Sequence, residues 1–234
     1  PVPFLICFWL ATAACSGDAP PIHIEPPPPP PGEWVASDLA RELDPDVDAA
    51  TLQKLTLDNL AFGLDLYAEL AATPGNLFIS PHSISVALAM THAGAEGNTE
   101  AEMASVLHFD LPEPQLHHAF NKLDLKLATR DQLPPDVDGD GFQLSIVNQL
   151  FGQTGFLFEA DFLDALAVNY GAGMRLLDFS ADPERARARI NDWVEASTED
   201  RIEDLLPPGS IDAQTRVVLA NAIYFKASWS LPFK

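Results

Sequence analysis

Three carboxylates at alternate positions form the most metal-like pattern in the sequence. Asp136, Asp138 and Asp140 are followed by Gly141, as in the first half of an EF-hand loop, where alternate carboxylates face one calcium ion. The position of that motif's bidentate Glu is held by Val147, so one or two oxygen ligands are missing. Two interpretations therefore stay open, a weak calcium site and a solvated turn that binds no ion.

A second group consists of polar residues inside apolar segments. Ser80 and Ser83 stand at the start of the apolar segment 84–93, and Asn221 lies in the middle of the apolar segment 215–226. Polar groups in such surroundings must be hydrogen-bonded, so these residues predict a buried polar network. The simpler alternative is that Ser80 and Ser83 cap a helix and that Asn221 is a satisfied core amide.

The third candidate is Cys15, which follows an apolar run at residues 4–14. This run is too short to span a bilayer permanently but has the length of a signal-peptide core. The small residues before Cys15 resemble the lipobox of bacterial lipoproteins, in which the cysteine is lipidated and becomes the new N-terminus. We therefore expect a signal peptide and lipobox at 1–15, export, and an outer-membrane lipoprotein or extracellular protein. Cleavage of an ordinary signal peptide near the same place is the alternative.

Charge and motif content exclude several classes of function. Asp and Glu number 34 against 13 Lys and Arg, which gives a formal charge of −21 and opposes binding to nucleic acid. There is no Gly-x-Ser-x-Gly, His-Glu-x-x-His or phosphate-binding glycine loop. The six His residues are scattered, and His117 and His118 are neighbours on a predicted helix, where they cannot face one site together. The sequence therefore predicts a protein that is not an enzyme and has no cofactor, apart from the calcium interpretation above.

Periodicity predicts the elements that position these residues. A proline-rich acidic linker at 16–44 precedes one α+β domain at 45–234. The first helix carries an apolar stripe that we expect to be buried, a capping box at Thr99 and Glu102 opens another helix, and Asp182 caps a third. The stripe includes Leu57, Leu60, Leu64 and Tyr67. The predicted helices cover 57–71, 84–93, 99–107, 114–127, 159–170 and 183–194, and the predicted strands cover 76–81, 142–151, 174–179 and 215–226.

Two long motifs resemble the serpin family. Residues 76–84, continuing into 87–90 and 94–99, are similar to the second-helix region of serpins. Residues 218–226, with Trp229 and Phe233 after them, are similar to the third strand of the central sheet A. The resemblance extends over about 45–234. It implies the serpin fold, here the region of helices A to F and part of sheet A, truncated before the reactive-centre loop.

The resemblance also implies a function for the full-length protein. Serpins inhibit serine proteases, and in some cases cysteine proteases, as monomers whose cleaved loop inserts into sheet A as a new strand. Ser80, Ser83 and Asn221 match the polar shutter of the family, and Trp229 matches the breach where the loop enters. The reactive bond is expected beyond Lys234, so the fragment alone would not inhibit. The alternatives are a non-inhibitory serpin and a surface lipoprotein that binds calcium or a partner.

Overall fold

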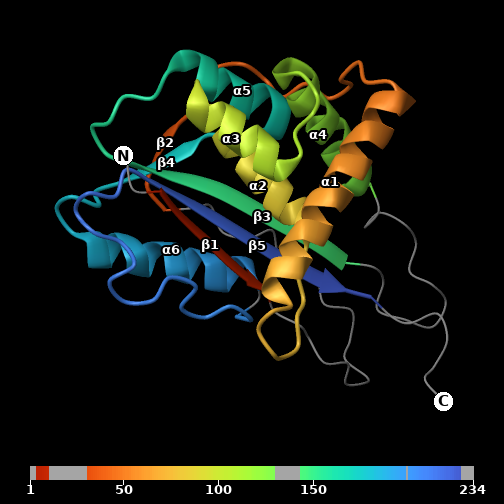
Figure 1. The fold of residues 1–234 in the computed structure, drawn as a ribbon. Helices are drawn as coiled ribbons and strands as arrows, with labels where there is room; N and C mark the ends of the chain where they lie inside the picture. The colour runs from red at the N-terminus through yellow and green to blue at the C-terminus, as the bar shows by residue number, and fades with distance from the viewer. Residues whose placement is uncertain (1–3, 11–30, 130–142, 199, 228–234) are drawn as a thin grey trace, which may run out of the picture.

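A mixed β-sheet with helices on both faces forms the centre of the protein (Figure 1). The computed structural model describes residues 4–10, 31–129, 143–198 and 200–227. No helix among these residues is long and apolar enough to cross a membrane. The strands are β1 (Phe4–Leu10), β2 (Glu33–Val35), β3 (Gln143–Gln153), β4 (Met174–Leu177) and β5 (Val217–Lys226). The helices are α1 (Ala49–Leu70), α2 (Pro81–His92), α3 (Asn98–Leu107), α4 (Glu113–Leu127), α5 (Ala160–Tyr170) and α6 (Pro183–Ser197).

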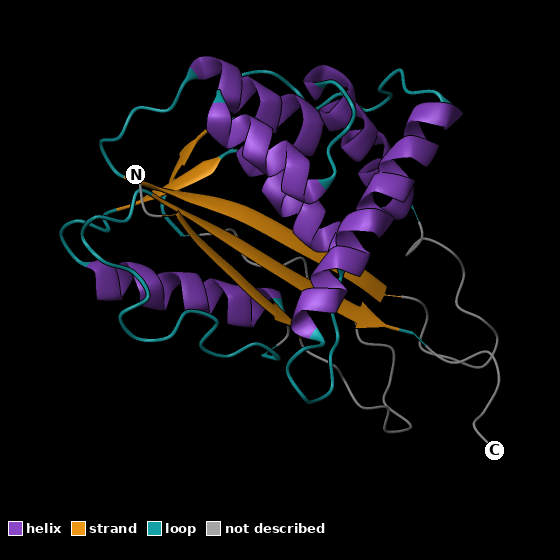
Figure 2. Ribbon diagram, in the orientation of Figure 1, coloured by secondary structure: helices purple, strands orange, loops and turns teal. Residues whose placement is uncertain are grey.

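The sheet has the strand order β1-β5-β3-β4-β2 and combines parallel and antiparallel pairs (Figure 2). Strands β3 and β5 form its longest antiparallel ladder, from Gln143 opposite Lys226 to Gly152 opposite Val217. Strand β4 runs parallel to β3, and β2 runs antiparallel to β4. On its other side β5 pairs in parallel with β1. Strand β5 is therefore interior in this sheet, as its apolar character on both faces predicts.

Alternation along β5 divides its side chains between two cores. Val218, Ala220 and Ala222 pack in the cluster under α6, whereas Leu219 packs in a cluster with α2 and α5. Figure 1 shows α6 on one side of the sheet and the other helices on the opposite side. Since successive strand residues point to opposite faces, Asn221 faces α2.

Local sequence signals explain where α6 begins. The Asp182 carboxylate accepts a hydrogen bond from the Arg185 backbone N–H at 3.0 Å, and Pro183 occupies the first turn. Both features favour helix initiation. Trp193 of α6 meets Phe151 of β3 edge to face, with ring centroids 5.6 Å apart. The predicted cap is confirmed, and Trp193 is buried.

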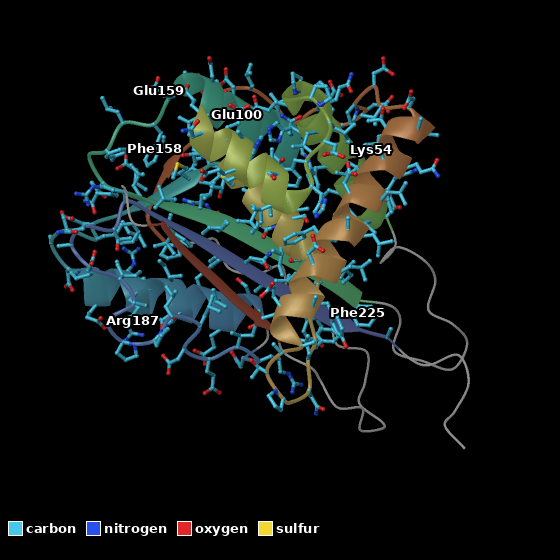
Figure 3. All side chains as sticks on the ribbon, viewed as in Figure 1. Lys54, Glu100, Phe158, Glu159, Arg187 and Phe225 are labelled. Atoms are coloured by element: carbon cyan, nitrogen blue, oxygen red, sulfur yellow. The ribbon has the colours of Figure 1, made fainter. Side chains whose placement is uncertain are left out.

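The first helix buries a different face from the predicted one. Helix α1 begins at Ala49, capped by Asp48, and packs against α2 and α4 through a face that includes Leu55 and Phe62. The predicted stripe is exposed instead, at Leu57, Leu60, Leu64 and Tyr67. The prediction was wrong because α1 carries apolar residues on two faces, and periodicity alone does not tell which face meets the core. Figure 3 labels Lys54 on the same helix. This residue forms ion pairs with Asp58 and Asp110.

Two further local predictions were wrong. Residues 76–81 are not a strand, because among the described residues no strand pairs with them. Helix α3 begins at Asn98, directly after Gly97, so the predicted capping box at Thr99 and Glu102 does not form. Gly97 has φ = +61°, a left-handed conformation that glycine adopts at little cost and that sets the start of this helix.

The folded part begins before residue 45, inside the predicted linker 16–44. Glu33–Val35 pairs with β4 as the edge strand β2. Further along, Arg41 donates to the Asn121 side-chain oxygen at 2.9 Å and forms an ion pair with Asp124 at 2.6 Å. Asn121 in turn donates to the backbone oxygen of Glu42 at 2.7 Å. The part of the linker that the structure describes therefore packs on the domain.

Candidate functional site

A polar network joins the centre of the sheet to the first turn of α2. The Asn221 side-chain amide on β5 donates to the Ser83 hydroxyl at 2.7 Å and to the Ser83 backbone oxygen at 3.3 Å. The same amide donates to the side-chain oxygen of Asn148. Asn148 lies directly opposite Asn221 in the register of β3 and β5. We call Ser83, Asn148 and Asn221 the seam network.

Secondary structure places each member of the seam network. Strand alternation sends the two Asn side chains to the face covered by α2. Helix α2 starts at Pro81, with Ser80 as its N-cap, and the Ser83 backbone N–H donates to the Ser80 hydroxyl at 3.4 Å. Ser83 and Asn221 are thus in direct contact, whereas Ser80 is linked to them through the helix cap. Ser80 therefore caps α2, and Ser83 and Asn221 belong to a buried polar network.

The seam network is uncharged, and Ser83 and Asn221 are buried whereas Asn148 is half-buried. Ser83 is 1% exposed and Asn221 is 4% exposed. Amide and hydroxyl groups do not supply a general acid or base near neutral pH, but they both donate and accept hydrogen bonds. Such groups can exchange partners when strands move without burying a charge. The arrangement therefore suits a contact that breaks and re-forms in a conformational change better than it suits a catalytic centre.

His82, one residue from Ser83, is the titratable group nearest to the seam network in sequence. Burial lowers the pKa of its ring below the ordinary value, and a nearby negative charge at Asp124 opposes this effect only in part. Neither ring nitrogen has a hydrogen-bond partner among the described residues. The neutral form of His82 is thus the one that this environment favours.

Several residues predicted from the sequence lie outside the described part of the chain. These are Cys15, Trp229, Asp136, Asp138 and Asp140. Conversely, Asn148 was not predicted from the sequence. It is a polar residue in a mostly apolar strand, which was the available signal. Its partner Asn221 lies 73 residues away, and only the strand register brings the two residues opposite each other.

Comparison with known proteins identifies the family. A family model described as "Serpin (serine protease inhibitor)" matches residues 57–234. The chain belongs to the serpin family. Among curated relatives it is 40% identical to a leukocyte elastase inhibitor from Sus scrofa over 184 residues, which is 78% of this chain and 46% of the relative. It is also 38% identical to Ipis-1 of Ixodes persulcatus over 179 residues, 75% of this chain and 45% of that protein.

Solved structures support the serpin fold. Emu ovalbumin superposes with a TM-score of 0.65 and 30% sequence identity, over 77% of this chain and 48% of ovalbumin. The predicted α+β serpin fold is therefore confirmed for the N-terminal region. This serpin chain spans slightly less than half the length of the relatives that it matches.

Proposed function

We propose that the full-length protein is an inhibitor of a serine protease, with no catalytic activity of its own. In the proposed mechanism the protease cleaves an exposed loop, which then enters the sheet beside β5 as an additional strand. Support comes from the family description and from relatives whose names identify them as elastase inhibitors. The observation that carries the mechanism is the seam network, which joins β5, β3 and α2 at the centre of the sheet.

The edge of β5 that faces away from β3 is the proposed insertion site. In the structure this edge pairs with Phe4–Leu10, in register from Phe4 opposite Val217 to Leu10 opposite Ile223. A strand edge with unpaired backbone groups readily accepts another segment. If residues before Cys15 are removed as a leader, as we propose, the edge is left available for the inserting loop.

The proposed role of the seam network is to control the opening of the sheet. Insertion requires β5 to move relative to the helix layer, so the contact of Asn221 with Ser83 has to loosen and form again. A buried polar contact is costly to leave unpaired, which favours two discrete arrangements over a gradual opening. Ser80, Ser83 and Asn221 therefore act as the proposed shutter, and Asn148 joins them. Trp229 remains the proposed breach residue.

The test is a reaction of the full-length protein with an elastase-type serine protease. We expect a covalent complex that survives SDS, because the trapped species is an acyl-enzyme; its mass should be that of the protease plus the inhibitor up to the cleaved bond, since the segment after that bond is the leaving group. A protease whose catalytic serine is replaced by alanine provides the control and should give no complex. Cleavage without any complex, across serine and cysteine proteases, would contradict the proposal and favour the non-inhibitory alternative.

We also propose an exported, monomeric protein attached to the outer membrane by a lipid on Cys15. The apolar run before Cys15 and the small residues next to it support this proposal. For Asp136, Asp138 and Asp140 the favoured interpretation is a solvated turn, since Val147 replaces the bidentate ligand. Calcium titration by calorimetry tests this interpretation, which a measurable heat of binding would contradict.

A further inference from the structure

Two buried histidines and a glutamate converge between α2 and α4. His92 lies in the last turn of α2, and Glu113 and His117 lie one turn apart on α4. The Glu113 carboxylate is 3.9 Å from Nδ1 of His92 and 3.7 Å from Nε2 of His117. One ligand atom from each residue falls within 4.8 Å of the others. The two imidazole side chains are only 4% and 5% exposed.

Three nitrogen atoms of this cluster lack partners. Among the described residues, neither ring nitrogen of His92 makes a hydrogen bond, and neither does Nε2 of His117. A buried polar atom without a partner is unfavourable by roughly 1–3 kcal/mol, so three in one place call for an explanation. An ion bound between the rings would supply the missing partner for one nitrogen of each histidine.

The other ring nitrogen of His117 already has a hydrogen-bond partner. Its Nδ1 is 2.7 Å from the hydroxyl of the partly buried Tyr170 on α5. Histidine ligands commonly use one nitrogen for the metal and the other for an orienting hydrogen bond of this kind. The contact fixes the ring so that Nε2 faces Glu113. Tyr170 is thus placed as a positioning residue.

The surroundings also suit a metal ligand. Phe109 packs edge to face on His92, with ring centroids 5.5 Å apart, and supplies an apolar wall.

We propose that His92, Glu113 and His117 bind one zinc-class divalent transition metal ion, with water as the fourth ligand. Two imidazoles and one carboxylate form a donor set that zinc prefers, whereas calcium and magnesium prefer oxygen ligands alone. Metal bonds of 2.0–2.1 Å at a tetrahedral angle place ligand atoms about 3.3 Å apart. The ligand atoms therefore need to close by roughly 0.4–1.5 Å on binding. The half-exposed side chain of Glu113 is the one with room to rotate. The ion would join the end of α2 to the start of α4.

The experiment uses the full-length protein after removal of metal by a chelator. Calorimetry with Zn²⁺ should give one ion per chain, and Co²⁺ should give the visible absorption of a tetrahedral complex that Ca²⁺ and Mg²⁺ do not displace. Glu113→Gln changes a half-exposed side chain and His117→Gln removes an imidazole. We expect each to weaken Zn²⁺ binding at least tenfold. Tyr170→Phe should weaken it by about 10–100-fold, as outer partners of metal ligands do.

His118→Gln and Glu102→Gln are the matched controls. His118 is next to His117 but is not in the cluster, and Glu102 is an exposed glutamate on α3. Both controls should bind Zn²⁺ as the unaltered protein does. Three results would overturn the proposal: no uptake of Zn²⁺ by folded protein, full binding by Glu113→Gln with a native circular dichroism spectrum, and an equal loss of binding in the controls.

Discussion

Replacing Asn221 with alanine removes the donor that joins β5 to both β3 and α2. The change leaves the side-chain oxygen of Asn148 and the oxygens of Ser83 without this donor. An unsatisfied buried group is unfavourable by about 1–3 kcal/mol, and Asn148 is half-buried, so water can reach part of it. The lost side chain also leaves a small cavity beneath α2. We expect Asn221→Ala to lower the free energy of unfolding by roughly 2–4 kcal/mol.

Urea denaturation of the full-length protein measures this loss as a lower midpoint at an unchanged slope. Asn148→Ala and the double variant complete a cycle whose coupling energy should exceed about 0.5 kcal/mol, because the two amides are in contact. Asn59→Ala is the matched control: Asn59 accepts from the buried Ser85 hydroxyl at 2.7 Å between α1 and α2, so this change also unpairs a buried group but should add to Asn148→Ala without coupling. Two results would contradict the prediction: a loss below about 0.5 kcal/mol for Asn221→Ala, or a double variant whose loss equals the sum of the two single losses.

Three other changes test separate parts of the account. Burial lowers the pKa of His82 in the folded protein, so below about pH 6.5 the unfolded chain binds a proton at this ring more readily than the folded protein does. The contribution of His82 to the free energy of unfolding is therefore fully present above about pH 6.5 and falls below it by at most about 1.4 kcal/mol per pH unit. His82→Gln should flatten this part of the stability curve measured by urea denaturation, and an unchanged slope would contradict the assignment. Asp182→Ala should lower the free energy of unfolding by about 1 kcal/mol through loss of the α6 cap, whereas Asp192→Ala on an exposed part of the same helix should change it little. Cys15→Ala should release the protein from the membrane fraction, and unchanged fractionation would exclude lipidation at this residue.

Elements with strong local signals were predictable from the sequence. The Asp182 cap sets the start of α6, and the apolar segment predicted as a strand at 215–226 forms the interior strand β5. For α1 the local signal was ambiguous, and Leu57 and Leu64 are exposed. The chain spans less than half of its relatives' length, so in a protein of their length we expect further chain to cover this apolar face.

Sites assembled from distant segments were only partly predictable. Ser83 and Asn221 could be selected because each is polar in an apolar segment, although 138 positions separate them. His92 and His117 gave no comparable signal, since their convergence depends on the packing of α2 against α4. The spacing of Glu113 and His117, four positions apart on one helix, was the available signal for that cluster.

Hydrogen exchange along β5 directly tests whether the cleaved loop inserts beside this strand. The full-length protein, in its form without residues 1–14, is compared before and after reaction with its target protease. We predict that backbone amides of Val217–Lys226 exchange more slowly after the reaction, because an inserted strand pairs with the edge of β5 that faces away from β3. A cleaved loop with unchanged exchange along β5 would contradict insertion at this edge.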